Sequence, residues 1–444
     1  MKPGNAGGAK GPDTPAAGCR QPVMEGPAPR SKAYVIPKRL VWEAYQRVKA
    51  NRGAAGVDGQ SLSAFETRLK DNLYKIWNRM SSGSYFPPPV KLVEIPKASG
   101  GRRPLGIPTV ADRIAQTAVM MVLDPCVEPV FHADSYGYRR GRSALDAVGV
   151  TRRRCWAFDW VVDLDIKAFF DSLDHELVER AVAHHTDLAW VRLYVSRWLR
   201  APVEHPDGTR VSRSRGTPQG GVISPLLANL YLHYAFDVWM RRNYPQCPFA
   251  RYADDAVVHC RTREQAEEVV EAIRGRLLQC HLELHPTKTR IVYCKDDDRP
   301  GGGEHTSFDF LGYTFRPRLA RNRWGKYFLS FLPAISNKAA AGIRQTIRSW
   351  RIVRSRRHQD LEALAALINP AVRGWMNYYG RFYRSRCVQV LRYVDQILAA
   401  WVRRKYKRFS RRVTAAIHWL GRVARREPRL FAHWELGVRP TAGV

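Results

Sequence analysis

The sequence has few acidic residues and no long apolar run. Its 444 residues contain 40 Asp and Glu against 73 Lys and Arg, which leaves a formal net charge of +33. An excess of this size favours a polyanionic partner, either a nucleic acid or, less readily, an anionic membrane surface. No apolar segment approaches the length that crosses a membrane, and the N-terminus lacks the apolar core of a signal peptide. We therefore expect a cytoplasmic protein.

Paired metal-binding residues of the common zinc motifs are also missing. The eight cysteines are scattered without a C-x-x-C pair, so we expect free, mostly buried thiols and no zinc site. His175-Glu176 is not followed by a second histidine at the spacing of a zinc protease. The apolar content of 45% is nevertheless that of a globular chain, and its length allows two or three domains.

Two adjacent aspartates stand between short apolar runs in the stretch from Phe249 to Cys260. The runs are rich in β-forming residues, so the pattern predicts a strand, a tight turn and a second strand, with Asp254 and Asp255 at the tip. Neighbouring carboxylates repel each other, and Mg²⁺, which prefers hard oxygen ligands, would offset that repulsion. A solvated hairpin turn is the ordinary alternative, because aspartate is common in turns.

A second predicted strand, from Asp159 to Ile166, carries acids on one face. A period of two places Asp163 and Asp165 on one side of this strand and its apolar residues on the other. One acid from this strand and two from the hairpin can hold two Mg²⁺ ions about 3.5–4 Å apart, the arrangement that serves phosphoryl and nucleotidyl transfer. We take Asp165 as the first ligand, and interpret Asp163 and Asp171 as supporting or structural residues.

Three segments, in this order, resemble the palm of a reverse transcriptase. They read LDIKAFFDSLDHE from Leu164, GTPQGGVISPLLANLYL from Gly216 and RYADD from Arg251. The resemblance is specifically to bacterial group II intron reverse transcriptase/maturases, and it extends over nearly the whole chain. It implies an α+β, right-hand polymerase fold with fingers and palm, in which an antiparallel sheet packs on helices, followed by an all-helical thumb and maturase domain.

Resemblance and composition together suggest five parts. We expect a disordered tail at 1–33, an N-terminal extension and fingers at 34–155, the palm with the catalytic site at 156–315, the thumb and RNA-binding maturase domain at 316–426, and a C-terminal tail at 427–444. Many family members continue into a DNA-binding segment and an endonuclease with paired cysteines and histidines. The sequence has no counterpart of these segments, so it resembles the endonuclease-lacking type.

The resemblance also implies roles for individual residues. The catalytic metal ligands would be Asp165, Asp254 and Asp255, holding two Mg²⁺ ions with Mn²⁺ as a substitute. Five side chains would surround the incoming nucleotide: Lys97, Arg103, Phe170, Gln219 and Lys288. Ordinary interpretations remain open, because hairpin cations and lysines are often solvated and a phenylalanine is often simply core. The stretch from Phe131 to Ser143 mixes aromatics with arginines, as nucleic-acid contacts or a plain surface loop would.

The C-terminal third has almost no acids. From Arg316 to Arg426 there are 27 Lys and Arg against 3 Asp and Glu. The pattern predicts helices at 335–352, 359–367, 371–386 and 388–408. On a continuous helix from Arg373 to Arg384, aromatics occupy one face and arginines the other, which suits a phosphate backbone better than a mixed-sign solvated face. The candidate RNA contacts are Arg373, Arg381, Arg384, Arg403, Arg404, Lys405, Lys407 and Arg408.

The function implied by the resemblance is that of an RNA-directed DNA polymerase. Such an enzyme would bind its group II intron RNA, assist its splicing and copy it into DNA by target-primed reverse transcription during retrohoming. The implied partners are the intron RNA, a DNA target or primer and dNTPs, without a membrane, and the chain would act as a monomer or homodimer. The alternatives are a reverse transcriptase reassigned to phage defence or CRISPR adaptation, and a splicing-only RNA-binding maturase.

Overall fold

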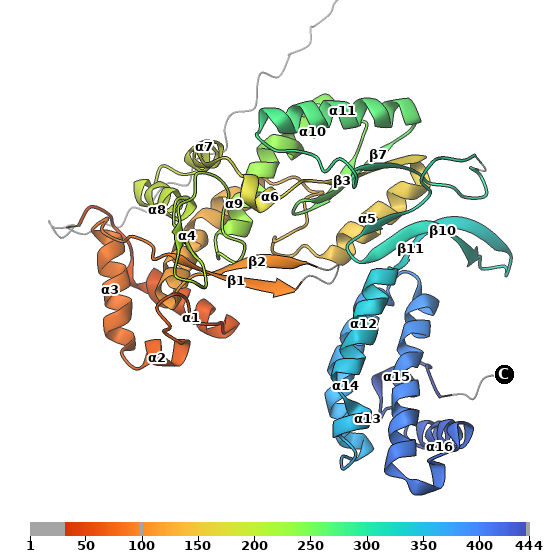
Figure 1. The fold of residues 1–444 in the computed structure, drawn as a ribbon. Coiled ribbons are helices and arrows are strands. Elements are labelled where there is room, and N and C mark those ends of the chain that lie inside the picture. The colour runs from red at the N-terminus through yellow and green to blue at the C-terminus, as the bar shows by residue number, and fades with distance from the viewer. Residues whose placement is uncertain (1–31, 97–100, 300, 441–444) are drawn as a thin grey trace, which may run out of the picture. The chain divides into compact units, whose positions relative to one another are not determined.

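A computed structural model describes residues 32–96, 101–299 and 301–440 (Figure 1). The chain divides into two compact units. The first unit comprises residues up to Arg139 together with Ile166–Asn243 and Arg274–Glu283. The second unit comprises Arg140–Asp165, Tyr244–Ile273 and the chain from Leu284 onward. Each unit is described by itself below.

The first unit combines helices with a small four-stranded sheet of order β2-β1-β4-β5. Strands β1 and β2 form an antiparallel hairpin, and β4 lies parallel to β1 on its other edge. The strands are β1 Val90–Pro96, β2 Arg102–Ile107, β4 Val203–Glu204 and β5 Arg210–Val211. The helices are α1 Lys38–Asn51, α2 Leu62–Glu66, α3 Leu69–Ser81, α4 Val110–Val127, η1 Glu128–Val130, α6 Phe169–Ser172, α7 His175–His185, α8 Ala189–Leu199, α9 Ser224–Leu232, the π-helical turn η2 His233–Asp237 and α10 Val238–Asn243.

Helix α4 is the buried centre of this unit. The side chain of Thr109 caps its first turn by accepting a hydrogen bond from the backbone N–H of Asp112 at 3.1 Å. The Asp112 carboxylate is itself buried, and it accepts hydrogen bonds from the Tyr85 hydroxyl at 2.9 Å and the Trp198 indole N–H at 2.7 Å. Gln116 donates to the same carboxylate and accepts from the backbone N–H of Val222. This network fixes the loop before α9 against α4.

The second unit contains an antiparallel sheet of order β6-β7-β3-β8. Its strands are β3 Trp160–Asp165, β6 Phe249–Tyr252, β7 Asp255–Cys260 and β8 Arg290–Tyr293. Val161, Val162, Val257 and Val258 are fully buried in it, as expected for its central strands. Helix α5 (Ala144–Ala157) packs against β6, and α11 (Arg263–Gln279) follows β7. A second sheet, of order β11-β10-β9, contains β9 Phe308–Phe310, β10 Tyr313–Arg321 and β11 Tyr327–Ile335.

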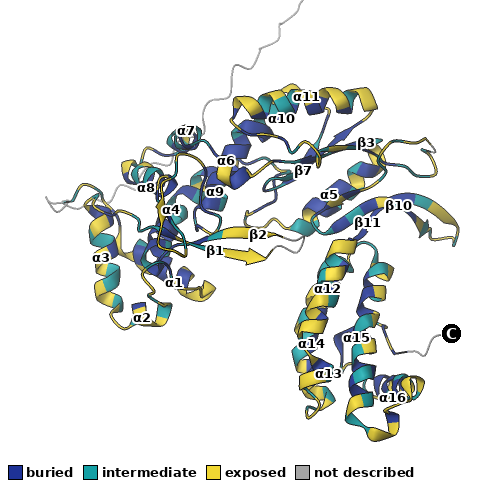
Figure 2. Ribbon diagram, viewed as in Figure 1, coloured by how far each residue is buried: buried dark blue, intermediate teal, exposed yellow. Residues whose placement is uncertain are grey.

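The C-terminal part of the second unit is helical. Its elements are α12 Asn337–Ser349, α13 Ile352–Ser355, α14 Leu361–Tyr379, α15 Arg384–Lys405, η3 Lys407–Phe409, α16 Val413–Arg426 and α17 Ala432–Glu435. One core cluster joins them, and it includes Phe431 and Trp434 from the segment after α16. Figure 2 shows this core as dark blue inner faces beneath exposed outer ones. The mixed fold with antiparallel sheets and a helical C-terminal region confirms the predicted fold class. The helices begin at Asn337, however, so the all-helical part expected from 316 onward starts later, after strands β10 and β11.

Four further expectations from the sequence can be compared with the structure. The two helices predicted at 359–367 and 371–386 are one helix, α14, which runs through Pro370 and ends at Tyr379. The predicted continuous helix from Arg373 to Arg384 is therefore wrong, because Gly380 follows the last helical residue and α15 starts anew at Arg384. Free buried thiols are confirmed for six of the eight cysteines. Among the described residues, no helix is long and apolar enough to span a membrane.

Candidate active site

The register of the central strands brings distant aspartates together. Strands β3 and β7 are antiparallel, and Asp165 lies directly opposite Asp255. Side chains of opposed residues start about 4.5–5.5 Å apart at their Cβ atoms. The two-residue turn between β6 and β7 contains Asp254, preceded by Ala253 in the left-handed backbone region at φ +58°. The three carboxylates that the sequence singled out therefore share one end of the sheet.

A buried arginine supports the aspartate turn. Arg251 is only 1% exposed, and its guanidinium donates to the carbonyl of Ala253 at 2.9 Å. A left-handed alanine costs on the order of 1 kcal/mol or more, so the turn needs such a fixed partner. The bond holds the turn that carries Asp254 and Asp255 in place from behind.

An open cavity of about 510 Å³ lies at this end of the sheet. Its polar lining consists of five acids, two cations and one hydroxyl: Asp163, Asp165, Asp254, Asp255, Asp309, Lys288, Arg290 and Ser307. Four of the aspartates come from β3 and the β6–β7 hairpin, and Asp309 comes from β9. Negative charge is thus concentrated in one recess of the second unit.

The aspartates perturb one another. Burial raises the pKa of Asp255 well above its usual range, and the charges of Asp163, Asp254 and Asp165 raise it further. Burial likewise raises the pKa of Asp163 to about 7, although the Arg290 guanidinium opposes the shift. Each shift means that the ionised carboxylate lacks sufficient positive charge nearby. A cation placed in the cavity would remove that deficit.

The donor set suits a hard divalent cation. Carboxylate oxygens are the ligands that Mg²⁺ prefers, and Mg²⁺ usually completes its shell with water and substrate phosphates. Within the described residues, no three acidic, histidine or cysteine side chains are already gathered around a single ion position. One reason is visible: Lys288 Nζ lies 2.8 Å from Asp165 Oδ2 and balances that charge itself. The residues therefore fit a divalent ion that substrate helps to bind.

Three of the five nucleotide candidates lie together in the first unit. Arg103 Nε donates to Gln219 Oε1 at 2.6 Å, which joins the β2 strand to the glycine-rich loop 216–221. The backbone of this loop also meets Phe170, whose carbonyl accepts from the N–H of Thr217 at 2.8 Å. A Cβ on Gly220, at φ +115°, would lie 2.4 Å from the carbonyl of Gly106, so only glycine fits. Lys97 lies outside the described residues, and Lys288 is in the second unit.

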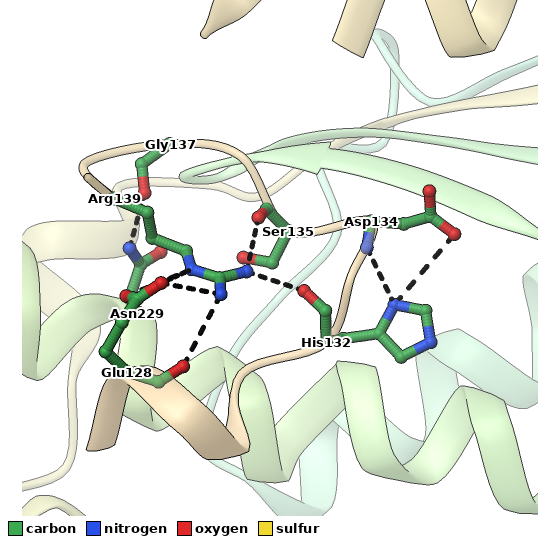
Figure 3. A network of polar contacts seen from close by, with 7 residues as sticks. All are labelled: Glu128, His132, Asp134, Ser135, Gly137, Arg139 and Asn229. Carbon is green, nitrogen blue, oxygen red and sulfur yellow. Dashed lines mark hydrogen bonds and ion pairs between the residues drawn. The ribbon is translucent and has the colours of Figure 1, made fainter. Parts of the chain in front are cut away.

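The arginine-rich stretch after η1 is partly structural. Arg139 is buried, and its guanidinium pairs with Glu128 at 2.8 Å and donates to the carbonyls of His132 and Ser135 (Figure 3). The Asn229 side chain from α9 donates to the carbonyl of Gly137 at 2.6 Å in the same network. Arg139 thus holds its own loop in shape, which the mixed aromatic and basic pattern of the sequence did not indicate.

The candidate RNA contacts fall into two groups. Arg373, Arg381, Arg404 and Lys407 are exposed, and no hydrogen bond or ion pair of their side chains is seen within the described chain. The others are engaged, since Arg384 donates to the carbonyl of Leu436, Arg403 to that of Ser410 and Lys405 to that of Gln359. The guanidinium of Arg408 lies 4.7 Å from the centre of the Phe409 ring.

Sequence reasoning missed Arg290 and Asp309 as cavity residues. Arg290 opens β8 and moderates the pKa of Asp163 from across the sheet, opposite it in the register. Asp309 lies on β9, where its carboxylate accepts a hydrogen bond from Thr314. Only Asp309 could have been noticed from the local sequence, because it is a single acid between two phenylalanines in a short β-prone run.

Comparison with known proteins agrees with this geometry. The family described as reverse transcriptase (RNA-dependent DNA polymerase) matches residues 95–315, and the group II intron, maturase-specific domain matches residues 340–419. Protein YkfC of Escherichia coli (strain K12) is 34% identical over 326 residues, covering 63% of this chain and 80% of that protein. The group II intron-encoded protein LtrA of Lactococcus lactis subsp. cremoris is 35% identical over 204 residues, covering 45% and 33%.

A third relative matches a longer part of the chain. It is an uncharacterized 91 kDa protein in a cob intron of Schizosaccharomyces pombe, 31% identical over 409 residues, with coverage of 78% of this chain and 50% of that protein. The chain thus spans a third of LtrA and half of the yeast protein.

The fold, the aspartate site and the first family match define an RNA-dependent DNA polymerase. The maturase-specific domain narrows the class, and the chain belongs to the group II intron reverse transcriptase/maturase family. Reverse transcription and a role in splicing follow from the two domains, and the maturase domain implies binding of intron RNA. Reassignment to defence and a splicing-only protein are not favoured.

Proposed function

We propose that the chain joins deoxynucleotides to a DNA primer on its group II intron RNA, at the end of the sheet where Asp165, Asp254 and Asp255 converge. The observation that carries the proposal is the direct pairing of Asp165 with Asp255 next to Asp254. Two bound divalent ions, Mg²⁺ with Mn²⁺ as a substitute, would polarise the α-phosphate and lower the pKa of the primer hydroxyl. The three carboxylates would hold them.

Other residues of the chain would bind the nucleotide. Arg103 presents a planar fork that matches phosphate oxygens, and its hydrogen bond to Gln219 fixes the side chain in advance. Gln219 and the backbone of its glycine-rich loop would contact sugar and base, with the Phe170 ring beneath the sugar to exclude a 2′-hydroxyl. We propose that Lys288 leaves Asp165 when an ion binds and pairs with the substrate instead. Lys97 would join Arg103 at the triphosphate.

The exposed cations of the helical part would bind the intron. Arg373, Arg381, Arg404 and Lys407 are exposed, and neighbouring acids are scarce in that part of the sequence. Such a surface favours a phosphate backbone. The same protein would then hold the intron RNA for splicing, and copy it from a primer at the DNA target during retrohoming.

The test compares two substitutions in the same cavity. Asp254→Asn should lower primer extension on an RNA template on the order of 10²–10³-fold, the usual loss when one electrostatic stabiliser of the transition state is removed. Asp309→Asn makes the same charge change in the same cavity. Asp309 lies on β9, and not on β3 or the β6–β7 hairpin, so this variant should keep most of the activity. Intron RNA binding, measured without divalent ions, should be equal in both. Full primer extension by Asp254→Asn would refute the proposed site.

A further inference from the structure

Strands β10 and β11 form a long ribbon that the proposed polymerase site does not use. Each strand has nine residues, so the ribbon is roughly 30 Å long. Its near half is core, where Phe315 pairs with Pro333 and both are buried. Its far end, around the turn, is mostly exposed and appears largely yellow in Figure 2. The ribbon has five Lys and Arg and no Asp or Glu between Tyr313 and Ile335.

The ribbon is anchored on both edges at the pair Leu319 and Leu329, two residues before its strands end at the turn. The Tyr383 hydroxyl donates to the carbonyl of Leu319 at 3.0 Å on one strand. The Asp297 carboxylate accepts from the backbone N–H of Leu329, opposite it on the other strand, at 2.9 Å. Beyond this point, the hydrogen bonds of the ribbon among the described residues are to itself. The far end is therefore a supported projection, which needs no further partner inside the protein.

The turn at the far end is rigidly built. The Asn322 side chain accepts hydrogen bonds from the backbone N–H groups of Trp324 and Lys326, both at 3.0 Å. Gly325 takes a left-handed conformation at φ +87°, and its carbonyl accepts from Arg321 Nε at 3.2 Å. A turn fixed this way loses little entropy when it binds, so its exposed side chains are preorganised.

The exposed side chains at the turn are aromatic and basic. Trp324 is 74% exposed and Tyr327 is 65% exposed, the former among the most exposed large side chains of the described chain. The Arg323 guanidinium lies 4.1 Å from the centre of the Trp324 ring, and Arg321 lies 5.8 Å from the Tyr327 ring. Aromatic faces beside cations, with no acid in the ribbon's own sequence, suit a strand of nucleic acid with accessible bases.

A second exposed aromatic with an arginine over its ring, Phe86, differs from Trp324 in what its arginine binds. Phe86 is 70% exposed with Arg197 at 3.8 Å, but Arg197 donates to the carbonyls of Gly83 and Tyr85. Arg197 is thereby committed to its own fold. No such bond of Arg323 is seen within the described residues, so its charge remains available.

We propose that the turn from Asn322 to Tyr327 binds an unpaired stretch of nucleic acid, with Trp324 stacked on a base and Arg323 and Lys326 at the phosphates. Bases in a duplex are hidden by their neighbours, so a single strand is the ligand. The inference rests on the proposed function only in that the protein handles RNA. The proposed binding site is at the turn of the ribbon, at the opposite end of β10 from Tyr313.

The experiment measures binding without catalysis. A short, unstructured, fluorescein-labelled RNA strand and the same strand paired with DNA are titrated with the full chain in EDTA, and anisotropy is followed. Trp324→Ala should weaken single-strand binding about 5- to 150-fold, which corresponds to base–aromatic stacking of about 1–3 kcal/mol. Trp324→Phe should retain most of the affinity, and Phe86→Ala serves as the matched control.

Photocrosslinking supplies a second readout that does not depend on how stable a variant is. RNA carrying 5-bromouracil should crosslink to the peptide that contains Trp324 in the wild-type protein. Unchanged single-strand affinity in Trp324→Ala, equal losses for the duplex, or crosslinks only elsewhere would each overturn the inference. Primer extension by the wild type would still stand in those cases, whereas activity of Asp254→Asn would refute the polymerase site alone.

Discussion

At the scale of single residues, the buried carboxyl of Asp112 links stability to pH. Burial raises the pKa of Asp112 to about 6 from 3.8, although hydrogen bonds from Trp198, Tyr85 and Gln116 oppose the shift. A carboxyl whose pKa is higher in the folded state favours folding when protonated, and it loses that advantage as pH rises from about 4 to about 6. The loss amounts to about 3 kcal/mol, because each pKa unit is worth about 1.4 kcal/mol.

The prediction concerns the difference between wild type and Asp112→Asn. The free energy of unfolding of the wild type, relative to this variant, should fall by about 2.5 kcal/mol between pH 4 and pH 7. Urea unfolding followed by tryptophan fluorescence at several pH values measures the difference. Every other titrating group is common to both proteins and cancels. A difference that does not change with pH would show that the carboxyl is not shifted.

Residues differ in how far the sequence reveals them. Asp254 and Asp255 were predicted because their signal is local, two adjacent acids between two short β-prone runs. Asp165 was predicted because strand periodicity gave its face and the family resemblance gave its role. Arg139 was not recognised as buried, since its partners are a carboxylate and carbonyls placed by the folded loop. The cavity position of Arg290 depends on strand order, which local patterns do not encode.

At the scale of elements, α14 shows tertiary contacts overriding a local signal. Proline removes a helical hydrogen bond, so the sequence predicted two helices where one runs through Pro370. The neighbouring Asn369 explains what supports this turn. Its amide donates to the carbonyl of Leu430 at 2.9 Å, and its oxygen accepts from the backbone N–H of Ala432 at 2.8 Å. The segment carrying Phe431 and Trp434 is thereby fastened to the middle of the helix.

Asn369→Ala should release that segment. Two backbone groups would lose their partners, at about 1–3 kcal/mol for each buried group left unsatisfied. Hydrogen–deuterium exchange should then increase in 430–436, ahead of the rest of the helical part. Asn377→Ala is the matched control, because Asn377 is exposed on the same helix. Equal exchange in both variants would show that the segment is held by its apolar packing alone.

At the scale of the whole molecule, the sequence predicted the overall charge and the helical C-terminal part, but not which of its cations are engaged within the fold. The composition predicted a polyanionic partner, and the helical pattern of the C-terminal third survives as α12 to α16. The sequence could not show which cationic side chains donate to backbone carbonyls of the protein and which do not. Arg373 and Arg384 look alike in a row of basic residues, but Arg384 donates to the carbonyl of Leu436 from the start of a new helix.

The net charge of +33 should make RNA binding strongly dependent on salt. Each phosphate contact releases counterions, and for a single strand it contributes about −0.7 to the slope of log K against log salt concentration. Replacing Arg373, Arg381, Arg404 and Lys407 by glutamine should therefore flatten the slope by about 3, if all four contact phosphates. Filter binding of intron RNA at several salt concentrations, without divalent ions, measures it.

The control removes four positive charges that already have carboxylate partners. Arg39, Arg210, Arg263 and Arg426 lie 2.7–3.0 Å from Glu43, Glu204, Glu267 and Glu427. Changing these four to glutamine alters the net charge equally, but a cation held by a neighbouring acid displaces few counterions from RNA. The slope should then stay near the wild-type value. Equal flattening in the two quadruple variants would mean that RNA responds to total charge, and that the helical surface has no special part in binding.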